Sequence, residues 1–340
     1  MNLGKNIALK VGALGLIILA SNFIYSEWFF EKDLQAYSPD INTIREIITK
    51  KAEVVYCGES SNISFFKDDN DKRFISQFLN EELPKTTVID FSKKAGHAGI
   101  YYDLLRAIPQ KNSVETIIIT MNLRSFGPDW INSNLETPLQ KEMVLLRPFP
   151  PLVNRFLLGF KNYDTTPANI REKRYKSHLE SDKLNLPKDF PYVTASEWEK
   201  DIIKIGEKVR KELKTAQIRE LASQYIKSYA FRIDPTTNPR IKDFDKIVDL
   251  AKNRGWKIVF HILPENVDRA EQLAGKKLVE IMTANSKLLQ NRYLNQKVIV
   301  VDNLSLLQND QFIDQDWTSE HYKEHGRRLI AKRISAALLL

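Results

Sequence analysis

The chain has 340 residues, of which 43% are hydrophobic and 28% are charged, and its formal net charge at pH 7 is +8. This composition is that of a folded globular protein, long enough for one large domain or a domain with an insertion. The lysines and arginines are interleaved with acids and form no dense basic block with aromatics, which argues against nucleic acid as a partner. The single cysteine, Cys57, can form no internal disulfide and lies in an apolar run, so we expect a buried core residue.

Residues 1–30 have the pattern of a transmembrane anchor. Lys5 and Lys10 precede an apolar run, and an aromatic cluster follows at 28–30. A membrane-spanning helix needs about 20 mostly apolar residues, which this segment supplies. Basic residues before the span place the N-terminus in the cytoplasm and the rest of the chain on the extracytoplasmic side, periplasmic or extracellular. The alternative is a signal peptide cleaved near Ser21, although no clean small-x-small cleavage site is present.

Residues 31–340 alternate helical and strand patterns. In chain order the pattern predicts a polar helix over 31–51, a strand over 52–57, a helix over 68–83, a strand over 86–91, a helix over 98–108 and a strand over 114–121. After residue 239 it predicts a helix over 241–254, a strand over 257–263, one or two helices over 265–293, a strand over 297–301 and a last helix over 322–338. The alternation of apolar strands with helices predicts a three-layer α/β/α domain with a mostly parallel, doubly wound, flavodoxin-like sheet.

The segment 127–239 breaks this alternation. It carries many prolines and scattered aromatics, and then a long charged helical run from Ser196 to Tyr229. We interpret it as a helical insertion or cap on the sheet, and not as an independent enzyme domain. Such a cap is expected to set substrate specificity.

Ser60 is the candidate nucleophile. It follows the first apolar strand, in the run Gly58-Glu59-Ser60. In an open α/β sheet, ligands bind beyond the carboxyl ends of the strands, where Ser60 is expected. Gly58 permits a sharp turn, and the amides after the turn can point at an oxyanion. A Gly-x-Ser run also fits a purely structural turn, but its place here favours acyl-transfer or ester chemistry.

Two further groups follow the next two strands. Gly96 lies in the loop after the second strand, and its amide could approach a substrate oxygen. Asn122 directly follows the third strand, and its side-chain amide could complete an oxyanion hole.

His321 is the candidate general base, because it lies just before the last helix, whose start can meet the end of the first strand at one sheet edge. A base of this kind needs a carboxylate to fix its tautomer. Asp316 is favoured for this role, with Asp314 and Glu320 as alternatives nearby in sequence. His321 and His325 have the i, i+4 spacing of a zinc site, but no third ligand is obvious, so no metal or other cofactor is expected.

At this point the chain resembles the SGNH (GDSL-type) hydrolase superfamily. The likeness lies in Gly58-Glu59-Ser60, the loop glycine, Asn122, and His321 with Gly326 five residues later. It spans about 52–126 and 257–338 and leaves the insertion uncovered. The resemblance implies Ser60 as nucleophile, Gly96 and Asn122 as oxyanion donors and His321 as base.

Two departures from that family's pattern bear on activity. Glu59 stands where the family has Asp, and Thr318 stands where it has Asp three residues before the His. The second departure leaves the third member of a triad open. It also favours the alternative of a catalytically silent SGNH-like binding or scaffold subunit.

A narrower likeness is to the membrane-anchored SGNH proteins that work beside membrane-bound O-acyltransferases, such as the D-alanyl transfer protein of teichoic-acid systems. It rests on the single N-terminal span and on the stretch Ser125 to Trp130 after the third strand. This resemblance implies an extracytoplasmic serine esterase or O-acyltransferase that acts on acyl groups of an envelope or exported glycan through an acyl-enzyme on Ser60. A membrane-bound O-acyltransferase would be its partner. A third reading, tied to signal-peptide cleavage, is a secreted lipase-like enzyme.

Overall fold

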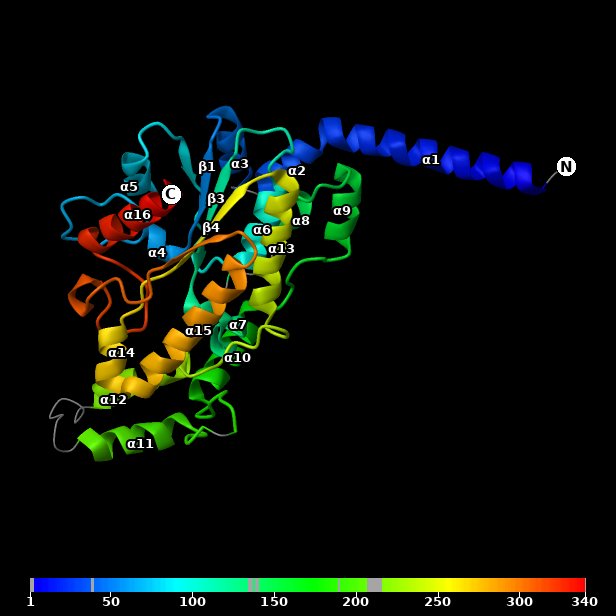
Figure 1. The fold of residues 1–340 in the computed structure, drawn as a ribbon. Coiled ribbons are helices and arrows are strands. Elements are labelled where there is room, and N and C mark those ends of the chain that lie inside the picture. The colour runs from blue at the N-terminus through cyan, green and yellow to red at the C-terminus, as the bar shows by residue number, and fades with distance from the viewer. Residues whose placement is uncertain are drawn as a thin grey trace.

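A five-stranded parallel sheet forms the centre of the protein (Figure 1). The computed structural model describes residues 3–37, 40–133, 137, 141–188, 190–206 and 216–339. The strands are β1 (Val54–Cys57), β2 (Val88–Asp90), β3 (Thr116–Met121), β4 (Lys257–Ile262) and β5 (Ile299–Asp302), in the order β2-β1-β3-β4-β5. Every neighbouring pair is parallel. All five predicted strands are confirmed, and the order is the flavodoxin-like one.

Helices cover both faces of the sheet, so the predicted three-layer arrangement is confirmed. One face packs against α5 (Ile75–Glu82) and α16 (Glu324–Leu338), and the other against α3 (Asp40–Thr49), α6 (Ala98–Ala107), α13 (Pro239–Arg254) and α15 (Lys276–Leu294). Successive strand residues point to opposite faces of the sheet. Tyr56 therefore packs in the core under α5 and α16, and Val55 packs in the core on the other face. Because both faces are buried, β3 is buried along its whole length, as its unbroken apolar run predicts.

The structure changes one predicted helix start and divides one predicted helical stretch into two helices. The helix predicted over 68–83 begins only at Ile75, because Asp69 and the Asp71 carbonyl bind the buried guanidinium of Arg327 from a loop. The predicted helical stretch 265–293 is two helices, α14 (Val267–Ala274) and α15, which are separated at Gly275 with φ 81°. A glycine is favoured there because a positive φ strains other residues.

The described part of the insertion 127–239 is helical, with isolated bridges but no sheet strand. It forms α7 (Pro128–Ile131), α8 (Lys141–Leu145), α9 (Pro151–Gly159), α10 (Ala168–Glu180), α11 (Ala195–Gly206) and α12 (Ala216–Tyr229). The predicted run from Ser196 to Tyr229 corresponds to α11 and α12, and residues 207–215 between them lie outside the described part. The buried Trp198 and Ile226 belong to the same core as β3, so the segment packs as part of the α/β body.

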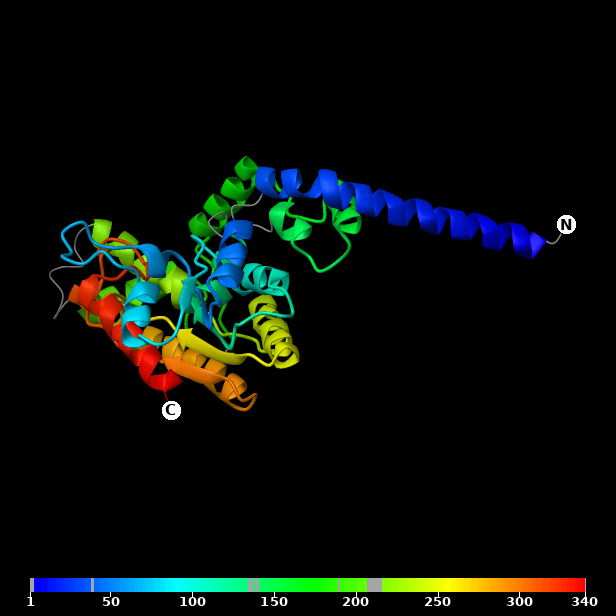
Figure 2. The same ribbon diagram turned by 90° about the horizontal axis from the view of Figure 1, so that it is seen from above.

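Helix α1 (Leu3–Trp28) projects from the body and is followed by α2 (Phe30–Tyr37) (Figures 1 and 2). From Gly4 to Trp28 it is long and apolar enough to cross a membrane, and its most apolar window is not buried in the protein. A signal sequence at the N-terminus would have the same length and composition.

Candidate active site

Ser60 lies where β1 ends at the carboxyl edge of the sheet. It is the first residue of the short helix α4 (Ser60–Ile63), two residues after Gly58. A Cβ at Gly58 would come within 2.5 Å of Ser92 Oγ and 2.7 Å of a ring carbon of Tyr56. Gly58 is not among the described glycines with positive φ. Gly58 lies in the turn from β1 to α4, as predicted, and the position needs a glycine because there is no room for a side chain.

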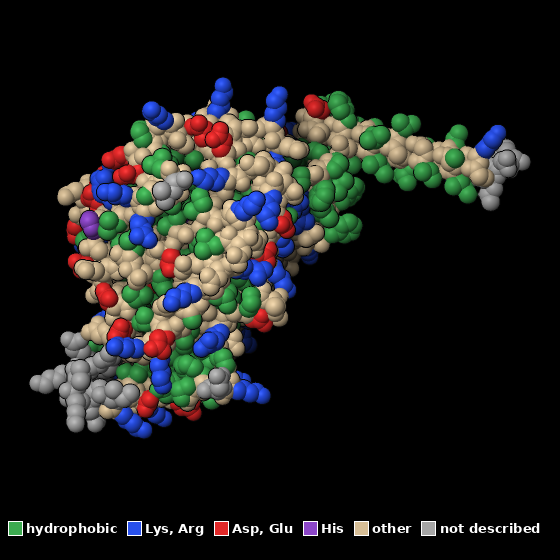
Figure 3. Space-filling model, viewed as in Figure 1, with side chains coloured by type: hydrophobic (Ala, Val, Ile, Leu, Met, Phe, Trp, Pro, Cys, Tyr) green, Lys and Arg blue, Asp and Glu red, His purple; other side chains and the backbone are tan. Residues whose placement is uncertain are grey.

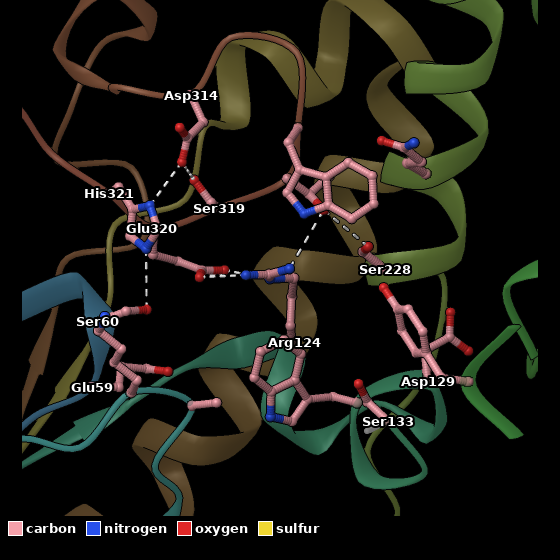
Figure 4. Close-up of a pocket in the computed structure, with 17 residues that line it drawn as sticks. Glu59, Ser60, Arg124, Asp129, Ser133, Ser228, Asp314, Ser319, Glu320 and His321 are labelled. Carbon is pink, nitrogen blue, oxygen red and sulfur yellow. Dashed lines mark hydrogen bonds and ion pairs between the residues drawn. The ribbon is translucent and has the colours of Figure 1, made fainter. Parts of the chain in front are cut away.

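Ser60, His321 and Asp314 form a continuous chain of hydrogen bonds (Figure 4). His321 Nε2 lies 3.1 Å from Ser60 Oγ, and His321 Nδ1 lies 2.8 Å from Asp314 Oδ2. A carboxylate can only accept, so the proton of the neutral ring is assigned to Nδ1, which leaves Nε2 to accept from the serine hydroxyl. The hydrogen bond from His321 is the main cause that lowers the pKa of Asp314, so this carboxylate stays ionised. The arrangement is that of a nucleophile, a base and an orienting carboxylate.

The carboxylate on His321 is Asp314, and the sequence preference for Asp316 is wrong. Phe312 and Tyr322 form an antiparallel bridge, and the Ile313 amide donates to the His321 carbonyl at 2.9 Å. This pairing brings the residues just after Phe312 beside His321, while Asp316 is exposed at the far part of the loop. The distance in sequence from His321, on which Asp316 was preferred, gives no sign of the Phe312–Tyr322 bridge.

Asp314 is held in place by a second donor. The hydroxyl of Ser319 donates to the same oxygen, Oδ2, that faces His321. The third alternative from the sequence, Glu320, points away from the histidine and forms an ion pair with Arg124 (Figure 4).

The two predicted oxyanion donors differ in what they can offer. The Gly96 amide donates to the Lys93 carbonyl at 2.9 Å, so it is engaged in its own turn, and Gly96 does not line the cavity beside Ser60. Asn122 is buried, and its Oδ1 accepts from the Arg124 amide at 2.9 Å. Its Nδ2 is buried without an acceptor in hydrogen-bonding geometry. Asn122 also lies outside the cavity lining, although its amide group is close enough to Glu59 to affect that carboxyl.

A cluster of buried charges lies beside Ser60 and His321. Arg124 donates through Nε and Nη2 to both carboxylate oxygens of Glu320, and its guanidinium stacks over the Trp130 ring at 5.1 Å. Glu59 is also buried; desolvation, with the nearby Glu320 charge, raises its pKa to about 8. Burial likewise raises the pKa of Glu265, which accepts a hydrogen bond from Tyr229. Glu59 stood out in the sequence as a departure from the family pattern, whereas the only signal for Arg124 was its place just after β3.

The triad opens into a cavity of about 540 Å³. Its lining comes partly from the sheet edge and partly from the insertion, which contributes Asp129, Trp130, Ser133, Tyr175, Gln224 and Ser228. The remaining lining residues include Lys94, Ala95, Trp317 and Thr318. Aromatic and acidic side chains therefore surround the reactive serine, and the insertion shapes the space in front of it.

Two further histidines, His97 and His261, have local partners. His97 is half-buried, its Nε2 lies 3.0 Å from the Thr137 carbonyl oxygen, and desolvation with the nearby Arg240 lowers its pKa to about 3. His261 is buried in β4, 2.9 Å from the Tyr56 hydroxyl. The described residues contain no group of three His, Cys, Asp or Glu side chains that could hold a metal ion.

Comparisons with known proteins give only distant structural likenesses. No family model matches the sequence, and no curated protein does. A GDSL-like lipase from Bacteroides thetaiotaomicron is 8% identical with a TM-score of 0.34, covering 86% of this chain and 90% of the lipase. An M. smegmatis aryl esterase is 10% identical with a TM-score of 0.35, covering 85% and 99%. A carbohydrate acetylesterase from Sinorhizobium meliloti is 10% identical with a TM-score of 0.31, covering 84% and 99%.

Proposed function

We propose that the protein is an SGNH-type serine esterase or O-acyltransferase that is anchored in the membrane and acts outside the cytoplasm on acyl groups of an envelope or exported glycan. The observation that carries the proposal is the hydrogen-bonded chain Ser60–His321–Asp314 at the wall of a cavity. A serine hydroxyl is a weak nucleophile unless a base removes its proton, and this geometry supplies that base.

The reaction follows from the three side chains. Ser60 Oγ attacks the acyl carbonyl carbon while its proton passes to His321 Nε2, and the imidazolium is stabilised by Asp314. The tetrahedral intermediate collapses as His321 returns the proton to the leaving alkoxide, which leaves an acyl-enzyme on Ser60. Water gives hydrolysis, and a sugar hydroxyl gives transfer; in either case His321 takes the proton of the incoming group.

The oxyanion donors are proposed from the residues around Ser60. Ser60 is the first residue of α4, so its backbone amide has no intrahelical acceptor and can face a substrate oxygen. Asn122 Nδ2 is buried without an acceptor in hydrogen-bonding geometry, which supports it as a second contributor. The same amide lies near Glu59 and acts to lower the pKa of that carboxyl, so Glu59 would compete for it. Gly96 is less suited than the sequence predicts, because its amide is bound to Lys93.

The cavity supports a sugar-bearing substrate. Trp130, Tyr175 and Trp317 offer flat apolar surfaces, while Asp129 and Gln224 offer polar groups around them. A few polar groups set among aromatic walls are typical of sites that orient a small ligand. The choice between water and a sugar hydroxyl as acceptor then depends on how fully the ligand fills the cavity.

An uncleaved anchor is favoured over a signal peptide because the aromatic cluster at 28–30 continues the span and no clean small-x-small cleavage site is present. Tyr25 is buried, and its hydroxyl donates to Asp33 at 2.7 Å. Both residues follow Ser21, so this contact fixes the end of α1 to the body with or without cleavage. Lys5 and Lys10 before the span support a catalytic domain outside the cytoplasm. A membrane-bound O-acyltransferase as acyl donor remains part of this proposal.

The catalytically silent scaffold is the second candidate. Thr318 favours this candidate, because the related family has an aspartate there. In this protein Asp314 is the carboxylate beside His321. An aspartate at position 318 is therefore not required for a triad.

The test is intact mass of the full chain in detergent after treatment with an activated fluorophosphonate. A single adduct on the wild type that is absent in Ser60→Ala and His321→Ala supports the proposal. Asp316→Ala, which changes an exposed carboxylate near the site, serves as a matched control and should keep the adduct. No adduct on a folded wild type, or an adduct that persists in Ser60→Ala, would contradict it.

A further inference from the structure

An exposed apolar surface continues from α1 onto the adjacent body of the protein (Figure 3). We call it the α9 stripe; it consists of Phe149, Val153, Phe156 and Phe160, which are 47%, 40%, 57% and 81% exposed. The last three are spaced three and four residues apart along and just after α9, so they lie on one face of the helix. Contiguous large apolar side chains on a surface mark a site of contact with a partner or a membrane.

The opposite face of α9 is fixed in the protein. Asn154 and Leu158, one turn apart, are buried. The Asn154 side-chain amide donates to the carbonyls of Leu145 at 3.1 Å and Arg147 at 2.8 Å. The α9 stripe is therefore the exposed face of a helix whose other face is packed and hydrogen-bonded to the protein.

Helix α9 packs against the end of α1. The Leu152 amide donates to Asn22 Oδ1 at 3.0 Å, and Arg155 forms an ion pair with Asp33 at 3.3 Å. Asn22 lies six residues before the end of α1 at Trp28, which is about 9 Å along a helix. The first turn of α9 thus lies beside the last turns of α1.

The contact between α9 and the last turns of α1 lies where α1 would leave the hydrocarbon core of the membrane. Lys10 and Glu27 bound a stretch of α1 without any charged side chain. A core about 30 Å thick takes about 20 helical residues, which places its outer boundary near the last turns of α1. Trp28 and Phe29, 66% and 51% exposed, lie at the same end, and such aromatics are typical of the membrane interface.

We propose that α9 is a second membrane contact, whose stripe inserts into the lipid interface beside α1. The inference rests on the proposed anchor. We expect lipid to cover the α9 stripe, because the stripe lies at the depth of the bilayer boundary and continues the exposed apolar surface of α1. Lys161 is exposed beside it, where it can meet an anionic headgroup. Two contacts fix the rotation of the catalytic domain about α1, and so the direction in which the cavity at Ser60 faces.

The test uses the full chain, one copy per nanodisc, in a mixture of phosphatidylcholine and phosphatidylglycerol. Phe156, Phe160, Leu16 and Phe65 are replaced one at a time by Cys and labelled with an environment-sensitive fluorophore. Leu16 reports on the middle of α1, and Phe65, 44% exposed, is the matched aromatic control outside α1 and α9. The unsubstituted chain should take up no label, since Cys57 is fully buried. Quenching is measured with acyl-chain nitroxide lipids and with aqueous iodide.

The labels at positions 156 and 160 are expected to be quenched by the nitroxide lipids and shielded from iodide, while the label at 65 shows the reverse. The inference is overturned if position 16 is quenched by lipid but 156 and 160 respond to iodide as 65 does; the stripe would then serve a protein partner, absent from the nanodisc. If iodide also quenches the label at position 16, both the proposed membrane anchor and the α9 contact are wrong. Neither result depends on the fluorophosphonate reaction at Ser60, so the esterase proposal is tested separately.

Discussion

Asp314 and His321 lie seven residues apart in sequence and face each other, Oδ2 to Nδ1, at 2.8 Å. The antiparallel bridge between Phe312 and Tyr322 brings them together, and the intervening loop carries Asp316 out to solvent. The carboxylate that lies beside His321 is thus set by a local pairing of the backbone, and not by a fixed spacing before the histidine.

Asp314→Ala should slow acylation of Ser60 strongly. Loss of the orienting carboxylate in a serine–histidine site typically lowers kcat by about 10⁴-fold. The measurement is the rate of fluorophosphonate labelling, or of hydrolysis of an activated acetyl ester, for the full chain in detergent. Asp316→Ala should react close to the wild-type rate, because its side chain is exposed and Asp314 already pairs with His321. Equal losses in the two variants would contradict the assignment.

The sequence predicts most of the fold because the strands carry an unambiguous signal. The run Ile117-Ile118-Ile119 is apolar on both faces, which indicates a covered parallel strand, and the structure places it at the centre of the sheet. Ser60 and His321 were predicted for the same reason, since the ends of such strands meet at one edge.

The parts that the sequence did not predict depend on packing contacts between particular residues, some distant in the chain and some near. Arg124 meets Glu320 across 196 positions, and Asp314 is selected by the Phe312–Tyr322 pairing. Gly58 is a glycine because Ser92 and Tyr56 crowd it. None of these relationships leaves a periodic pattern, so they become visible only when the packing is known.

The buried ion pair predicts a large loss of stability for Glu320→Gln. Arg124 and Glu320 have side chains 10% and 6% exposed, and removal of the carboxylate would leave a buried guanidinium without its partner. Breaking a buried pair in this way costs about 3–5 kcal/mol. The measurement is the free energy of unfolding by urea for the full chain in detergent.

Glu46→Gln is the matched control, because Glu46 forms an exposed ion pair with Lys50. Such surface pairs contribute about 0–1 kcal/mol. If Glu320→Gln loses no more stability than this control does, the buried Arg124–Glu320 pair does not stabilise the fold as expected.

Gly58→Ala should destabilise the protein and impair the reaction at Ser60. The added methyl group would meet Ser92, Tyr56 and Asn62 at 2.5, 2.7 and 2.9 Å. Overpacking of this kind costs about 1–3 kcal/mol, and any backbone shift would move Ser60 away from His321. Gly159→Ala, where nothing lies within 4 Å of the added Cβ, should leave both unfolding and labelling unchanged. A Gly58→Ala variant that reacts and unfolds like the wild type would show that the site has spare room.

Glu59 predicts a specific dependence of stability on pH. Burial raises its pKa from 4.5 to about 8, so between these values the folded protein holds a proton that the unfolded chain has released. The free energy of unfolding must then fall as pH rises through this window, with a slope of up to about 1.4 kcal/mol per pH unit from this group. Glu59→Gln keeps the shape of the side chain but cannot ionise, so it should remove this part of the slope. Urea unfolding of wild type and variant at pH 5, 6, 7 and 8 tests it: the difference between them should shift steadily in favour of the variant as pH rises. Parallel profiles would mean that Glu59 is already ionised in the folded protein at neutral pH, stabilised by Arg124 and Asn122.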